Sequence, residues 1–95
     1  MSELRLKCSV VSKLNIILKV EVATNQLTDY ATSIRMLLRV IDISRYFDGF
    51  TIPTEEILVP ETDEDFPFAT ACYLKFENHK GAIAFIESID PSNLD

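Results

Sequence analysis

The sequence predicts a single α+β domain with elements in the order β-β-α-β-β-α. The expected architecture is a mostly antiparallel four-stranded sheet with two helices on one face. Residues 3–10 and 15–23 alternate between apolar and polar side chains, as half-buried strands do. Residues 24–49 repeat apolar side chains with a helical period. A chain of 95 residues has no room for a second core, so the domain is expected to cover residues 1–95.

The two alternating segments predict an antiparallel hairpin, because only two or three residues separate them. The register that places Lys7 opposite Glu21 is favoured, since like charges facing each other destabilise alternatives. The turn lacks an Asn-Gly or Asp-Gly pair, so it does not fix the register by itself. The side chains expected to point inward are Leu4, Leu6, Cys8, Val10, Ile16, Leu18, Val20 and Val22.

Residues 24–49 predict a helix of roughly 22 residues, about 33 Å long, against which the sheet packs. Thr24 or Asn25 is the expected N-cap, and Gly49 is expected to adopt the left-handed conformation beyond the last turn. The apolar stripe consists of Leu27, Tyr30, Ile34, Leu37, Leu38 and Ile41. The polar side carries Arg35, Arg39 and Arg45, either as a solvated face or as a basic ridge for a partner.

The second half of the chain predicts a short edge strand at residues 57–59, because Pro53 and Pro60 flank it. Four acids in five residues follow at 61–65, and such a run cannot enter a core, so an exposed loop is expected.

Residues 66–77 then alternate again and predict the last strand, with Phe68, Thr70, Cys72, Leu74 and Phe76 on one face. Asn78 is a good N-cap for a second helix over residues 79–89.

Residues 72–82, from Cys72 to Ala82, resemble the third strand and following helix of RNA-recognition-motif domains. In that family a strand ending in Phe-Glu-Asn leads into a helix with an early alanine. The RNA-stacking motif of the family needs a basic residue, a glycine and aromatic residues, but Ala69, Thr70 and Ala71 stand there instead. The resemblance therefore implies shared strand–helix geometry and not RNA binding.

Charge is the most informative bulk property. The chain has 9 basic and 15 acidic residues, a net charge of −6. Residues 1–47 hold seven basic and four acidic residues, a net +3, whereas residues 48–95 hold two basic and eleven acidic residues, a net −9. This balance argues against direct binding of nucleic acid or an anionic membrane, which both need a positive surface. It favours a partner protein that is basic or binds nucleic acid.

Signatures of catalysis, metal binding and cofactor binding are missing from the sequence. Cys8 and Cys72 lack CxxC spacing and are expected to be buried, reduced thiols. His79 is the sole histidine, and two glycines cannot form a phosphate-binding loop. The acidic run does not match an EF-hand, and weak cation binding is the alternative for it. The N-terminus has no apolar leader and no apolar run reaches membrane length, so a cytoplasmic location is expected.

The first functional hypothesis is a small acidic protein-binding module that regulates or inhibits its partner. Its small size and the lack of recognisable chemistry favour an origin in a phage or an accessory genome, and an acidic surface that imitates the phosphate array of DNA is one form of this hypothesis. The residues expected to contact the partner are Glu61, Asp63, Glu64, Asp65, Phe66 and Phe50. The alternatives are a homo-oligomeric structural or assembly protein, such as a homodimer, that pairs through an edge strand, and an enzyme whose chemistry is not recognisable.

Overall fold

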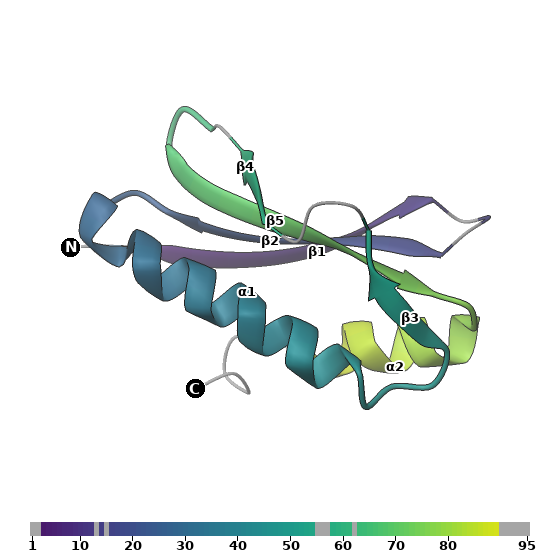
Figure 1. Ribbon diagram of the computed structural model, residues 1–95. Helices are drawn as coiled ribbons and strands as arrows, with labels where there is room; N and C mark the ends of the chain where they lie inside the picture. Colours follow the sequence, from purple (N-terminus) through teal and green to yellow (C-terminus); the bar gives the residue numbers. More distant parts are fainter. Residues whose placement is uncertain (1–2, 13, 15, 55–57, 62, 90–95) are drawn as a thin grey trace.

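A computed structural model describes residues 3–12, 14, 16–54, 58–61 and 63–89 of the chain. These residues form an antiparallel five-stranded sheet and two α-helices (Figure 1). The elements are β1 (Leu4–Ser12), β2 (Ile17–Thr24), the 3₁₀ turn η1 (Leu27–Asp29), α1 (Tyr30–Ser44), β3 (Phe50–Pro53), β4 (Val59–Glu61), β5 (Phe68–Phe76) and α2 (His79–Ser88). The predicted α+β class is confirmed, but the sheet has one strand more than expected.

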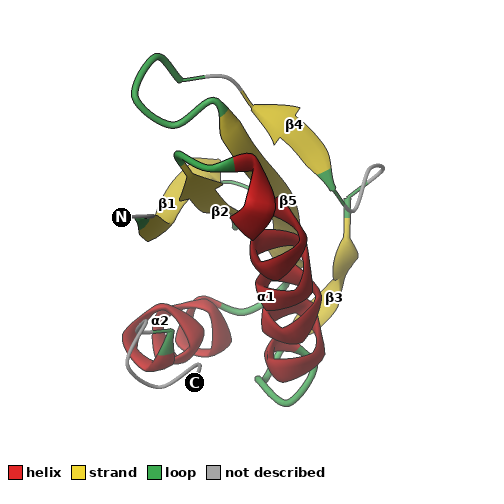
Figure 2. Cartoon of the chain, turned by 90° about the vertical axis from the view of Figure 1, so that its left-hand side faces the viewer, coloured by secondary structure: helices red, strands yellow, loops and turns green. Residues whose placement is uncertain are grey.

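The additional strand arises because two short strands share one edge of β5. The strand order is β1-β2-β5-β3, and β4 also pairs with β5. Phe50 of β3 lies opposite Phe76, and Val59 of β4 lies opposite Ala71, so the two strands occupy different halves of β5 (Figure 2). The expected edge strand at 57–59 is thus found at Val59–Glu61, and position 57 lies outside the described residues. Proline interrupts a ladder least at an edge, which fits the edge position of β3 and β4, because each contains a proline.

The hairpin of β1 and β2 has the predicted register, with Lys7 opposite Glu21. The ladder shifts between Val10 and Ser12. Two side chains expected to be buried are not: Leu4 is 45% exposed and Val10 is 52% exposed. β1 packs mainly on β2, whereas the principal contacts of α1 are with β2 and β5 and those of α2 are with β5. The helices therefore leave the inner face of β1 only partly covered.

The long helix is shorter than predicted and begins later. The chain first makes η1, and α1 then has 15 residues. Neither Thr24 nor Asn25 caps α1, and Asp29 occupies the N-cap position without a side-chain capping bond. The Thr24 hydroxyl instead accepts a hydrogen bond from the Gln26 N–H at 3.3 Å. Asn25 Oδ1 accepts from the Glu3 N–H at 3.0 Å and so ties the start of β1 to the end of β2.

The buried face of α1 is also rotated from the predicted stripe. Its buried residues are Ser33, Leu37, Val40, Ile41 and Ser44. Leu27 is 67% exposed and Leu38 is 44% exposed, so both were assigned wrongly. The Ser33 hydroxyl donates to the Tyr30 carbonyl at 2.7 Å, and that of Ser44 donates to the Ile41 carbonyl at 2.6 Å. Because the helix satisfies these hydroxyls itself, serine can lie inside, and a stripe defined by apolar residues alone misses the face.

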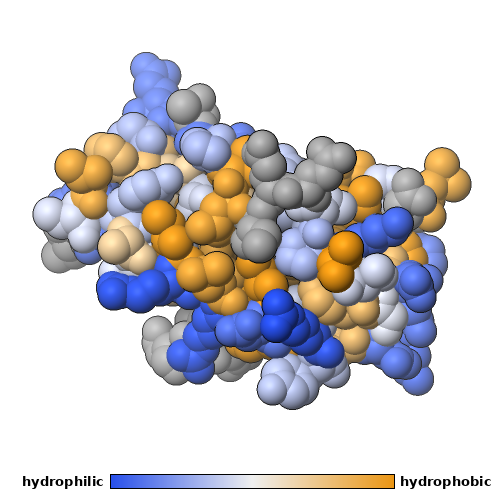
Figure 3. All heavy atoms as spheres, viewed as in Figure 1, coloured by the Kyte–Doolittle hydropathy of each residue, from blue (hydrophilic) through white to orange (hydrophobic). Residues whose placement is uncertain are grey.

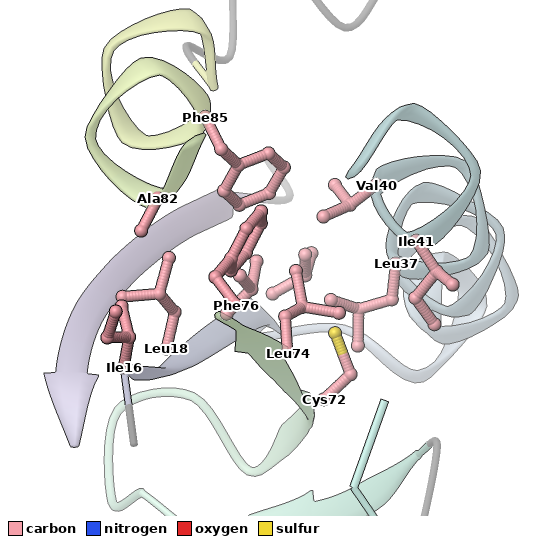
Figure 4. Close-up of a cluster of buried hydrophobic side chains, with 12 residues drawn as sticks. Ile16, Leu18, Leu37, Val40, Ile41, Cys72, Leu74, Phe76, Ala82 and Phe85 are labelled. Carbon is pink, nitrogen blue, oxygen red and sulfur yellow. The ribbon is translucent and has the colours of Figure 1, made fainter. Parts of the chain in front are cut away.

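The core lies between the sheet and the two helices. Leu18 and Leu37 are both fully buried in this layer, as predicted (Figure 4). An aromatic cluster closes one end of it: the rings of Phe50 and Phe76 are 5.4 Å apart, and those of Phe76 and Phe85 are 5.5 Å apart. Phe47 packs edge-on against Phe85 at 5.5 Å. The cluster joins the turn after α1, which holds Phe47, with β3, β5 and α2.

α2 docks through two glycines at close range. Asn78 caps the helix as predicted, since its Oδ1 accepts from the Gly81 N–H at 3.2 Å, and the helix ends at Ser88 rather than residue 89. A β-carbon on Gly81 would collide with the Asp48 carbonyl oxygen. Gly49 has φ +77°, the left-handed conformation that the sequence predicts there, but a turn separates it from the end of α1. Glycine is therefore required at both points of contact.

Candidate functional site

The acidic segment, which consists here of Glu61 at the end of β4 and residues 63–65, lies against the outer face of the sheet, opposite the helices. Ala23 and Ala69 point to this face, yet both are buried. The contacts that hold the segment start from two cations of the hairpin. Lys19 Nζ lies 3.0 Å from Glu61 Oε1, and Arg5 Nη2 lies 3.2 Å from Asp63 Oδ2. The basic first half of the chain thus pairs internally with part of the acidic second half.

A third acid joins the two ion pairs into a network. Glu21 lies between the cations, with carboxylate oxygens 3.8 Å from Lys19 Nζ and 4.0 Å from Arg5 Nη2. The Tyr73 hydroxyl adds a hydrogen bond to Glu61 Oε1 at 3.4 Å. β1, β2, β4 and β5 each contribute at least one member, so the network fastens four strands to each other on the outer face.

The turn at residues 63–66 is fixed by its own contacts as well. The Asp65 N–H donates to Asp63 Oδ1 at 2.9 Å, which closes a local side-chain turn. The Arg5 guanidinium lies over the Phe66 ring, 4.1 Å from its centroid, in a cation–π contact. Glu64 and Asp65 make no such internal ion pair among the described residues and are exposed. The turn therefore holds two unpaired carboxylates on an anchored backbone.

The electrostatic environment follows from these partners. The pKa of Asp63 is lowered, first by the hydrogen bond from the Asp65 N–H and then by that from Arg5. The pKa of Lys19 is raised, mainly by its hydrogen bond to Glu61. Both shifts favour the charged forms that make the network.

The structure separates the six residues predicted to contact a partner into four groups. Glu61 and Asp63 are engaged within the chain, while Glu64 and Asp65 are exposed. Phe66 is half-buried beneath Arg5. Phe50 packs on Phe76 at the opposite end of β5, so it does not join the acidic turn in one surface.

Sequence reasoning missed Arg5, Lys19 and Tyr73 as the residues that hold the acidic segment. The opposite net charges of the two halves were a signal for such internal pairing. That signal was interpreted as a sign of an external partner.

A pocket of about 520 Å³ lies on the edge that β3 and β4 share. Its lining consists of Thr51, Ile52, Pro53, Thr54, Val59, Tyr73 and Lys75. Among the described residues of this lining, Lys75 supplies the one charged group, and none carries a carboxylate, thiol or imidazole. In Figure 3, apolar side chains gather in the middle of the view. Hydrophilic side chains project at the top, where Figure 1 shows the turn between β4 and β5. The described lining thus offers apolar contact and a cation, but no acid–base pair.

The thiols and the histidine do not form a reactive centre. Cys72 is buried and Cys8 is half-buried, so the expected burial holds fully for Cys72 alone; both are free thiols. Burial raises the pKa of Cys8 to about 11 and that of Cys72 to about 12, which keeps both protonated at neutral pH. His79 is exposed at the first turn of α2. Among the described residues, no group of three or more histidine, cysteine and acidic side chains is arranged to hold a metal.

Comparison with known proteins yields no match to a family model, a curated protein or a solved structure. Within the described part of the chain, neither helix has the length and hydrophobicity needed to cross a bilayer.

Proposed function

We propose that this protein is a small acidic protein-binding module that regulates or inhibits a basic partner protein. The supporting observation is the turn at residues 63–66, which carries Glu64 and Asp65 exposed on a backbone fixed by Asp63 and Phe66. A preformed turn loses little conformational freedom on binding, and unpaired carboxylates attract a cationic surface over distance. The partner's lysines or arginines would pair with these two carboxylates.

The basic partner in this proposal includes the case of a nucleic-acid-binding protein. Its phosphate-binding surface is basic, and the exposed carboxylates would then occupy the position of phosphates. Duplex DNA should compete with the protein for a partner that binds the turn through its phosphate-binding surface. Duplex DNA should not compete for a basic partner that binds the turn through a different surface. A source in a phage or an accessory genome remains part of this proposal, supported by small size and the missing signatures of catalysis.

The experiment compares two double variants of equal charge. Glu64→Gln/Asp65→Asn removes the unpaired acids of the turn, and Glu77→Gln/Glu87→Gln removes two exposed acids elsewhere. A partner is captured from the native host with the wild-type protein, and the association rate of each variant is then measured at low and high salt. The turn variant should associate roughly tenfold more slowly at low salt and lose most of its salt dependence. Equal rates for the two variants would contradict the proposal.

Phe66, the aromatic residue of the turn, should affect the dissociation rate, whereas the two acids should affect the association rate. Phe66→Ala removes the ring beneath Arg5, and with it part of the support of the turn. If the ring also contacts the partner, dissociation should accelerate while the salt dependence of association stays unchanged.

A further inference from the structure

Residues 4–11 of β1 form a long strand edge that no other strand of the described chain pairs with. β1 stands at the end of the strand order, and its one strand partner in the described chain is β2. It has nine residues, none of them proline or glycine. An edge of this kind is a template for pairing with another strand. By contrast, the opposite edge of the sheet is formed by strands of four and three residues that contain proline.

The side chains on the inner face of β1 are also incompletely covered. On the inner face, Leu4 and Val10 are 45% and 52% exposed, and Leu6 and Cys8 are only half-buried. The principal contacts of α2 are with β5, and its Ala82 lies beside Leu18 and Ile16 at the end of the hairpin (Figure 4). The described residues thus leave an apolar row partly uncovered beside the free edge of this strand.

We propose that β1 pairs antiparallel with β1 of a second copy of this chain, about a two-fold axis at Cys8. The sheet would then continue across both copies, with all helices on the same side. An antiparallel pair places directly opposed side chains on the same face, so the apolar rows of the two copies would meet.

The charges of β1 select this register. With Cys8 on the axis, Leu6 faces the partner's Val10, and Lys7 faces the partner's Ser9. Arg5 then faces the partner's Val11, close to the position where the ladder with β2 shifts. No cation opposes another cation in this arrangement. The pairing is self-complementary, which a two-fold interface requires.

Neighbouring registers with the helices on one side are less favourable. An axis at Lys7 places this lysine opposite its own copy, and an axis at Leu6 places Arg5 opposite the partner's Lys7. Each brings like charges together on the outer face, which destabilises a strand pair. An axis at Ser9 shortens the paired segment and leaves Leu4 and Arg5 without an opposed residue.

The first test is the molar mass in solution. Light scattering on the full chain should give twice the 10.8 kDa of one copy at high protein concentration and dissociation on dilution.

Val10→Lys introduces a cation into the apolar row at a half-exposed position and should return the mass to one copy. Ile52→Lys, at a position 62% exposed on β3, is the matched control and should remain a dimer. Circular dichroism checks that Val10→Lys folds. If it does not, Leu4→Lys is used for the same test. A monomer at every concentration, or equal masses for the β1 and Ile52 variants, would overturn the proposal.

The second test is the register. Diamide takes the hydrogen of each thiol and leaves a disulfide, so Cys8 should cross-link two copies if it lies on the axis. The pKa of Cys8 is raised to about 11 by burial, so the reaction is run at alkaline pH, where more thiolate is present. Cys8→Ser should abolish the cross-link. Lys7→Cys in the Cys8→Ser protein is the control, and a larger final fraction of cross-linked dimer there than at Cys8, with both reactions run to completion, would overturn the register.

The dimer does not depend on the proposed recognition of a basic partner. The Glu64→Gln/Asp65→Asn protein should still dimerise, because neither side chain belongs to β1. If partner binding is lost while the dimer persists, the proposed dimer is still supported. If the protein is a monomer but the turn variant still loses partner binding, the proposed function is still supported.

Discussion

The two faces of the sheet are closed in different ways. The inner face is covered by α1 and α2 through apolar contacts, with Leu18, Leu37 and Phe76 almost completely removed from solvent. The outer face is closed at one end by the segment between β4 and β5, which two ion pairs and a cation–π contact hold in place. Apolar burial is strong and insensitive to salt, whereas partly exposed ion pairs are weak and screened. We therefore expect the inner layer to determine stability and the outer layer to respond to conditions.

The largest effect should come from the inner layer. Leu37→Ala should lower the free energy of unfolding by about 2–5 kcal/mol, because a fully buried leucine leaves a cavity. Leu38→Ala, on the same helix but 44% exposed, should cost roughly 1 kcal/mol or less. Urea unfolding followed by circular dichroism measures both. Equal losses would mean that the buried face of α1 is assigned wrongly.

The contact between α2 and the turn after α1 is the next most sensitive. Gly81→Ala places a methyl group against the Asp48 carbonyl and should cost about 1–3 kcal/mol through displacement of the helix. Lys80→Ala is the control, since it is exposed one residue earlier and should change stability by less than about 0.5 kcal/mol. A neutral or stabilising Gly81→Ala would argue against this close packing.

The inner layer was largely predictable because it depends on short-range periodicity. Leu18 and Leu37 follow from alternation and from the helical repeat, and Asn78 follows from its position before a helix. The rotation of α1 was not predictable from apolar residues alone, since Ser33 and Ser44 satisfy their hydroxyls on the helix itself. Periodicity identifies a helix reliably, but the buried serines decide which side faces the sheet.

The outer layer was not predictable in the same way. Arg5 and Asp63 are 58 residues apart, and nothing local in the sequence joins them. The pairing depends on β4 lying beside β5, which brings the acidic segment back over the hairpin. Sequence analysis expected one exposed loop over residues 61–65, which is wrong for Glu61, because this residue is half-buried in β4. Only the structure separates Glu61 and Asp63, which form ion pairs within the chain, from Glu64 and Asp65, which are exposed.

The outer layer should show a moderate, salt-dependent coupling. A double-mutant cycle with Lys19→Met and Glu61→Gln should give about 0.5–1 kcal/mol at low salt and less at high salt. Arg45 and Asp42 on α1 provide the control cycle, since this pair is 3.8 Å apart and more exposed, and should give about 0.2–0.5 kcal/mol. A Lys19–Glu61 coupling no larger than that of the control would mean that the outer segment is not fastened by this pair.

The same pair should respond to alkaline pH. The folded protein raises the pKa of Lys19 through Glu61, so the contribution of the pair is complete below the unfolded pKa of lysine. It should be lost as pH rises through the higher pKa of the folded state. The control is the Lys19→Met protein, which should lack this part of the alkaline loss.

The smallest effect concerns the acid side of the same layer. The hydrogen bonds from the Asp65 N–H and Arg5 lower the pKa of Asp63, so its contribution is present above the unfolded pKa of aspartate. It should disappear as pH falls through the lower pKa of the folded state, and the turn should then detach while α1 and its contacts with the sheet remain. Titration of the Asp63 carboxyl by NMR, in the folded protein and in urea, measures the shift directly. Asp63→Asn should give a turn whose position no longer changes over this acidic range. If Asp63 titrates at the same pH in both states, the turn is not held by these bonds, and the preformed backbone on which partner recognition is proposed to rest is lost with them.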